Sequence, residues 1–141
     1  MGKKRIIKKT GEQGAAGAAS SPRSKRKLDA GILFVEATYN NTKVSLGDTS
    51  GNIVTWSSSG SLGFSGAKKG TPFAAAKVGE LIGERAGAMG VKEVSVIVSG
   101  VGAGRESSIR AFATKGIHLS GIRDNTPVPH NGPRPPKARR I

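Results

Sequence analysis

The positive charge of this chain is concentrated at its two ends, and this leaves only the middle able to fold into a packed domain. Residues 1–27 carry nine lysines and arginines against one acid, and residues 125–141 carry four against none. Residues 28–124 carry ten against eight and are nearly neutral. The end segments have too little apolar surface to offset the entropy of ordering them. We therefore predict a basic flexible tail over residues 1–29, one domain over 30–124 and an extended, proline-rich basic arm over 125–141.

A net charge of +14 with this distribution is typical of proteins that bind a polyanion, and nucleic acid is the partner that it favours. An anionic membrane surface is disfavoured because the tails lack Trp, Phe and Leu at amphipathic spacing. No apolar run approaches the roughly 18–20 residues that span a bilayer. The chain has no cysteine, which excludes disulfides and thiolate metal sites and fits a reducing compartment.

Apolar periodicity predicts an α/β domain. Alternating residues indicate three short strands, joined by turn signals at Asn40-Asn41 and residues 49–52. Thr71 and Pro72 are suited to begin a helix, and Gly90 is suited to end it. The predicted elements are strands 32–39, 42–48 and 53–57, helix 72–89, strand 91–99, helix 106–115 and strand 117–122. Their order, βββαβαβ, predicts a mixed sheet that resembles the ribonuclease-H-like topology.

The glycine-rich loop from Trp56 to Thr71 has the composition of a nucleic-acid contact. Glycines allow a close approach of the backbone, serines and the pair Lys68-Lys69 can meet phosphate and ribose, and aromatic rings can stack on bases. The alternative is that Trp56 and Phe64 belong to the core and that the serines form turns.

The segment GVGAGRE (100–106) lies between a predicted strand and a helix N-terminus, where backbone amides favour an anion. It differs from the dinucleotide fingerprint, because its spacing is GxGxG, its helix is short and the next acid, Asp124, falls at the end of a strand. We predict instead that an RNA phosphate binds here with the help of Arg105.

The ribonuclease-H-like topology also occurs in two-metal nucleases, which need several converging carboxylates. The candidates by position are Glu36, Asp48, Glu80, Glu84 and Glu93. Glu80 and Glu84 share one helix face but have cations beside them in the sequence, as on a solvated surface. The histidines, His118 and His130, have no acid at ligand spacing. We therefore predict no catalytic residue, no metal site and no cofactor.

Several motifs together resemble one family, the bacterial small-subunit ribosomal protein eleven. The resemblance covers about residues 30–141, and its closing element points to the bacterial or organellar branch. One departure is Pro133, where the family usually has cysteine. The motifs are EATYNNT (36–42), WSSSGSLGFSGAKKGTPFAA (56–75), SGVGAGRESSIRAF (99–112) and DNTPVPHNGPRPPKARRI (124–141).

The resemblance implies a structural role in translation, in the cytoplasm, without catalysis. Such proteins bind and bridge rRNA helices on the platform of the small ribosomal subunit and help to form the cleft that holds the Shine-Dalgarno duplex of the mRNA. Their neighbours are small-subunit proteins seven and eighteen, and often twenty-one. Carried over by matching position, the expected RNA contacts are Asn40, Asn41, Thr42, Trp56, Ser57, Ser58, Gly60, Lys68, Lys69, Gly102, Gly104, Arg105, His130, Asn131, Arg134, Lys137, Arg139 and Arg140.

Overall fold

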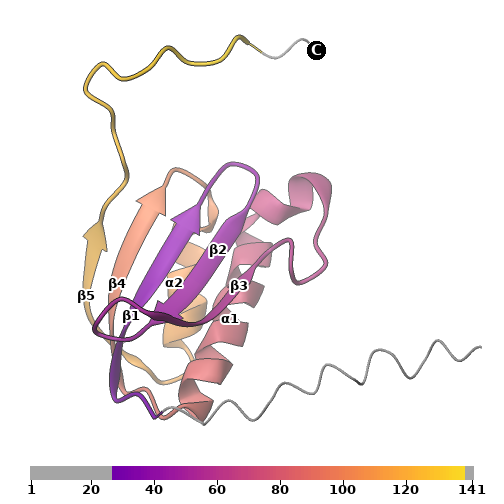
Figure 1. Cartoon of the computed structure of the whole chain (residues 1–141). Helices are drawn as coiled ribbons and strands as arrows, with labels where there is room; N and C mark the ends of the chain where they lie inside the picture. The colour runs from indigo at the N-terminus through magenta and orange to yellow at the C-terminus, as the bar shows by residue number, and fades with distance from the viewer. Residues whose placement is uncertain (1–26, 139–141) are drawn as a thin grey trace, which may run out of the picture.

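The computed structural model describes residues 27–138, which form a five-stranded sheet with two α-helices packed on one of its faces (Figure 1). The predicted order βββαβαβ and the mixed sheet are confirmed, with element ends shifted by at most two residues. The elements are β1 (Ala30–Ala37), β2 (Thr42–Gly47), β3 (Ile53–Ser58), the short 3-10 helix η2 (Gly66–Gly70), α1 (Pro72–Ala88), β4 (Glu93–Gly100), α2 (Gly104–Ala113) and β5 (His118–Asp124).

The strands lie in the order β3-β2-β1-β4-β5. β1 pairs antiparallel with β2 and parallel with β4, and β4 pairs parallel with β5. The last residues of β1, β4 and β5 therefore lie at the same end of the sheet, which we call the carboxyl end. Because β2 and β3 are joined as antiparallel neighbours, β2 begins and β3 finishes at this end as well.

The core lies between the sheet and the two helices. Leu33 and Val35 of β1 are fully buried, as the predicted alternation requires, and they pair with Leu46 and Val44 of β2. The same cluster includes Val94, Val96 and Val98 of β4, Val78, Ile82 and Ala86 of α1, and Phe112 of α2. The prediction that the first strand continues to Tyr39 was wrong. β1 ends at Ala37, a turn follows in which the Thr38 amide donates to the Asn41 carbonyl, and Tyr39 is 79% exposed.

The ends of α1 follow from local sequence. The Thr71 hydroxyl accepts a hydrogen bond from the Ala74 amide at 3.3 Å, and Pro72 occupies the first turn, where its missing amide is not needed. Gly90 follows the helix with φ of +79°, a conformation that glycine adopts without strain. Leu81 of α1 is only half-buried and does not belong to the core cluster.

The two helices cross closely because α1 has glycine at the crossing. A Cβ atom on Gly79 would overlap the backbone carbonyl of Ser108 in α2. We expect Gly79→Ala to lower the free energy of unfolding by about 1–3 kcal/mol, because the helices must move apart. Gly87→Ala is the matched control, since its Cβ would meet nothing within 4 Å. Alanine there should leave the stability unchanged or raise it by up to about 1 kcal/mol. Urea unfolding of both variants checks this, and equal effects would contradict the close crossing.

Candidate nucleic-acid interface

Four segments predicted to contact RNA meet at the carboxyl end of the sheet (Figure 1). The β1–β2 turn, the β3–α1 loop, the β4–α2 loop and the start of the C-terminal arm all leave the sheet there, and η2 lies against the β1–β2 turn. A Cβ on Gly70 would overlap the Tyr39 carbonyl, and one on Gly102 would overlap the Thr38 carbonyl. Chain segments far apart in sequence thus form one continuous surface.

The β1–β2 turn exposes only part of what was predicted. Asn40 is exposed and Asn41 is half-buried, but Thr42 is fully buried. The Thr42 carbonyl accepts the Ser59 amide at 2.9 Å, which ties this turn to the start of the next loop. The burial of Thr42 does not support direct contact with RNA, because its side chain is covered by the protein. Its hydroxyl and the Asn41 side-chain oxygen have no hydrogen-bond partner among the described residues.

The serines after β3 form a turn, as the structural alternative proposed. The Ser61 hydroxyl accepts the Ser58 amide at 2.9 Å and donates to the Ser58 carbonyl at 2.8 Å. Ser57 is 3% exposed, and its hydroxyl lies 3.2 Å from that of Ser61. Ser57 is therefore placed to hold the loop, whereas Ser58 is half-buried and Gly60 is exposed. Sequence reasoning did not single out Ser61, although serine three residues after serine is a common turn pattern.

The loop presents two lysines on η2. Lys68 is exposed, and Lys69 is half-buried beside Gly60, on which a Cβ would lie 3.7 Å from the Lys69 side chain. The Lys68 carbonyl accepts the Thr71 hydroxyl at 2.7 Å, so the start of α1 holds the lysine pair in place. Neither lysine is in a salt bridge with another described residue. Both charges are thus available to a phosphate.

Trp56 lies on the face of the sheet away from the helices and is 54% exposed, so the interpretation that it belongs to the core is wrong. The Lys43 ammonium lies 5.9 Å from the centre of the Trp56 ring. The strand register places Trp56, Ser45, Phe34, Ile97 and Arg123 in one row across that face. Sequence reasoning missed Lys43 and Arg123, although the alternation of β2 could have indicated Lys43. Phe64 is half-buried and packs edge-on against Phe73.

The β4–α2 loop differs from the predicted phosphate site. The Gly102 amide already donates to the Ala37 carbonyl at 2.8 Å, and Gly102 and Gly104 are buried. The Arg105 guanidinium is also engaged within the protein. It donates to the Gly100 carbonyl and to the Thr126 hydroxyl at 3.3 Å, and it pairs with the Asp124 carboxylate at 2.6 Å. Arg105 therefore braces the point where the arm leaves β5. An RNA phosphate would have to bind this guanidinium alongside these protein groups.

Asp124 is held in its charged form. Hydrogen bonds from the Thr126 hydroxyl, and next from Arg105, place the pKa of this carboxyl well below its ordinary value. Because the pKa is lowered in the folded protein, the stabilising contribution is complete above the ordinary carboxyl pKa of about 3.9 and is lost as the pH falls below it. At neutral pH the ion pair between Arg105 and Asp124, which we call the brace, is therefore intact.

The described part of the arm is exposed and extends away from the domain (Figure 1). The Asn125 amide donates to the Val98 carbonyl at 2.9 Å, and this bond continues the pairing of β4 with β5 for one residue. His130, Asn131, Arg134 and Lys137 are all exposed, as expected of groups that meet a partner. Asn131 has φ of +56°, which asparagine tolerates. The predicted contacts Arg139 and Arg140 lie outside the described residues.

The carboxylates considered for a nuclease do not converge. Glu80 pairs with Lys77 on α1, and Glu84 of α1 pairs with Lys115 in the turn after α2. Asp48 accepts the Ser50 and Asn52 amides in the β2–β3 turn. Those amides, Asn52 first, lower the pKa of Asp48. Within residues 27–138, no three acidic or histidine side chains gather as a metal site. Neither helix of this part of the chain combines the length and apolar character needed to cross a membrane.

Known proteins share this sequence over most of its length. A family model described as Ribosomal protein S11 matches residues 31–140. The chain belongs to this family. A relative named "Small ribosomal subunit protein uS11" from Synechococcus sp. is 50% identical over 123 residues, which cover 86% of this chain and 95% of the relative. Proteins of the same name from Gloeobacter violaceus and Solibacter usitatus are also 50% identical, over 83% and 84% of this chain and 90% and 88% of their own lengths.

Family membership confirms the resemblance found in the motifs. A ribosomal protein S11 is a structural component of the small ribosomal subunit and takes part in translation in the cytoplasm. It is not an enzyme, so the nuclease alternative is wrong. The single contacts with RNA remain predictions, to which the structure adds the exposure of each side chain.

The brace between Arg105 and Asp124 has a measurable consequence. We expect Arg105→Gln to increase hydrogen exchange of the Asn125 amide several-fold, because the first residues of the arm lose their anchor. Arg110→Gln is the matched control, since Arg110 forms an exposed pair with Glu106 on the same helix, away from the arm. Exchange of Asn125 that is equal in both variants would show that Arg105 does not hold the arm.

Proposed function

We propose that this protein binds and bridges helices of small-subunit rRNA on the platform of the subunit, and that it helps to form the Shine-Dalgarno cleft. The observation that carries the proposal is the meeting of the β1–β2 turn, the β3–α1 loop with its lysines, and the C-terminal arm at the carboxyl end of the sheet. The family resemblance supports the platform and the cleft as the location. It also supports small-subunit proteins seven, eighteen and twenty-one as neighbours.

The charge at this end suits a phosphate backbone. Lys68, Lys69, Arg134 and Lys137 are cations of the loop and the described arm, and none of them is in a described salt bridge. Asp124 is the acid nearest the arm, and Arg105 already neutralises it. Asp29, Asp48 and Glu93 lie at the opposite end, because they precede β1, follow β2 and begin β4. Two further acids near the carboxyl end have a cation beside them, since Glu36 of β1 lies opposite Lys43 in the strand register and Glu106 of α2 pairs with Arg110. A polyanion is therefore attracted to the carboxyl end.

Bridging follows from joining a rigid surface to an extended arm. The turn and the loop are held by hydrogen bonds to the domain, so they can contact one RNA element in a defined geometry. The arm leaves from a braced start and carries its cations away from the domain, where they can reach a second element. The exposed Trp56 ring, with Lys43 over it, adds a surface on which a base or ribose can stack.

The lysine pair can be tested against cations elsewhere on the domain. Each neutralised phosphate contributes about 0.7–0.9 to the slope of log K against log salt. We expect the double variant Lys68→Gln/Lys69→Gln to reduce the slope for platform rRNA by about 1.4–1.8. The double variant Lys27→Gln/Lys92→Gln removes the same charge from the opposite end, where both residues are exposed. It should change the slope much less, and equal reductions would mean that RNA binding is not localised at the carboxyl end.

The contribution of the arm can be measured in the same way. We expect glutamine at Arg134, Lys137, Arg139 and Arg140 to reduce the salt slope by about 2.8–3.6, because four charges are lost while the prolines remain. A chain ending at Asp124 should show the same reduced salt slope as this four-residue variant. It should also fail to enter small subunits stably. Arg110→Gln, which removes one exposed charge of α2 and leaves the arm charges intact, is the control for a disturbed domain. An unchanged slope and normal incorporation would contradict a role for the arm.

A further inference from the structure

Tyr39 has the most exposed aromatic side chain among the described residues, at 79%, and it lies in the β1–β2 turn at the carboxyl end of the sheet. Two other aromatic side chains, those of Trp56 and Phe73, are also exposed, at 54% and 64%. Tyr39 is not among the contacts carried over from the family, although it directly precedes Asn40. A large apolar ring left in water at a binding surface is typical of a group that a partner covers.

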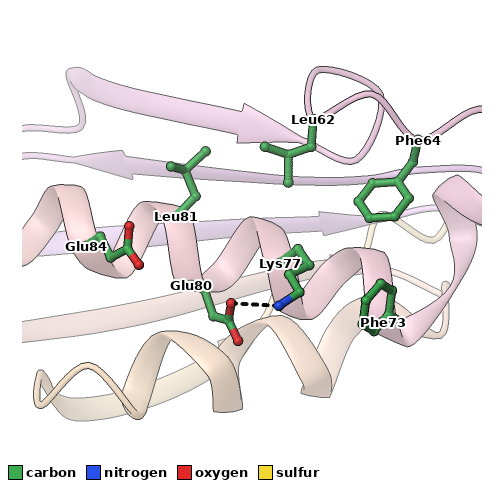
Figure 2. A pocket seen from close by; sticks show the side chains of 7 residues that line it. All are labelled: Leu62, Phe64, Phe73, Lys77, Glu80, Leu81 and Glu84. Atoms are coloured by element: carbon green, nitrogen blue, oxygen red, sulfur yellow. Dashed lines mark hydrogen bonds and ion pairs between the residues drawn. The ribbon is translucent and has the colours of Figure 1, made fainter.

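The three exposed rings differ in what surrounds them. The Lys43 ammonium lies 5.9 Å from the centre of the Trp56 ring. The Lys77 ammonium lies 5.6 Å from the centre of the Phe73 ring, which lines an apolar groove on the outer side of α1 (Figure 2). Tyr39 has no ring partner and no cation over its ring in the part of the chain that the structure describes. Its ring is therefore free to pack against another molecule.

The backbone around Tyr39 is held both within the turn and from two neighbouring loops. The Thr38 amide and hydroxyl donate to the Asn41 carbonyl at 2.8 and 3.1 Å, and the Asn41 amide donates to the Thr38 hydroxyl at 3.1 Å. A Cβ on Gly70 would overlap the Tyr39 carbonyl, and one on Gly102 would overlap the Thr38 carbonyl. Little backbone ordering is then needed when a partner binds, and this favours affinity.

The surroundings of Tyr39 favour RNA as the partner. The helix η2, which lies against the turn, carries Lys68 and Lys69. Neither residues 37–47 nor residues 49–79 contain an acid. A phosphate can therefore approach the turn without meeting a carboxylate from these segments. Bases within a duplex stack on one another, whereas an unpaired base can be turned out and stacked on an aromatic side chain.

We propose that Tyr39 stacks on an unpaired base of small-subunit rRNA while Lys68 and Lys69 hold phosphates of the same loop or bulge. The proposal rests on the proposed function, RNA binding at the carboxyl end, and names the class of RNA that this end takes. Because every base has a face that can stack, the ring selects an unpaired nucleotide and not a particular sequence.

Affinity and salt dependence together separate stacking from charge. We expect Tyr39→Leu to weaken binding of the full chain to platform rRNA by about tenfold, as for the loss of one stacked base. The salt slope should stay unchanged, because no charge is removed. Tyr39→Phe keeps the ring and should bind as the original chain does. Phe73→Leu is the control, because it removes another exposed ring away from the turn, and it should not change the affinity.

The outcomes of this comparison are distinct. Equal affinities of Tyr39→Leu and Phe73→Leu would overturn the proposal. A loss with Tyr39→Phe as large as with Tyr39→Leu would also overturn it, because the hydroxyl would then make the contact. Equal urea midpoints would show that a weaker affinity does not come from unfolding. The proposed function fails separately, if the original chain does not prefer platform rRNA or if Lys68→Gln/Lys69→Gln keeps the full salt slope.

Cross-linking from position 39 identifies the partner. The full chain with Tyr39→p-benzoylphenylalanine is assembled with small-subunit rRNA and purified small-subunit proteins, and the assembled subunits are irradiated. We expect a cross-link to a nucleotide in a loop or bulge. The same photoreactive residue at Ile53, which is exposed at the opposite end of the sheet, is the control and should not reach that nucleotide. A cross-link from position 39 to a continuous duplex or to a protein, or no cross-link, would contradict stacking on an unpaired base.

Discussion

The parallel pairing of β1 with β4 is the constraint on which the rest of the molecule depends. It places the chain after β4 beside the chain after β1, with the Gly102 amide bound to the Ala37 carbonyl. Because β1 is also antiparallel to β2, the β1–β2 turn and the β3–α1 loop reach the same end. The parallel pairing of β4 with β5 then releases the arm there. One register thus assembles a surface from segments spread over more than eighty residues.

Charge differs between two parts of the domain surface. The carboxyl end carries free lysines and a braced basic arm, and its nearest acid is neutralised by Arg105. The outer side of α1 carries an apolar groove with balanced charge. The short glycine- and serine-rich loop between β3 and α1 connects the two surfaces.

Local patterns were sufficient for most of the fold and for part of the interface. Alternation placed Leu33 and Val35 in the core, and Thr71 with Pro72 marked the start of α1, because these signals act over a few residues. The exposure of Lys68 and of the arm also agrees with the predictions from composition. Alternation alone did not decide whether Trp56 is buried or exposed, because the face of β3 that the helices cover depends on how the whole sheet packs.

The sequence by itself determined where the chain can fold, which elements it forms and which family it belongs to, since charge segregation, periodicity and motifs are local properties. Only the tertiary structure decided which groups are free to act. Arg105 and Asp124 are nineteen residues apart and meet through the pairing of β4 with β5, so a side chain predicted to bind phosphate also has partners within the protein. Thr42 and Gly102 are likewise covered or bonded by neighbouring loops. Such contacts depend on long-range packing, which no local pattern encodes.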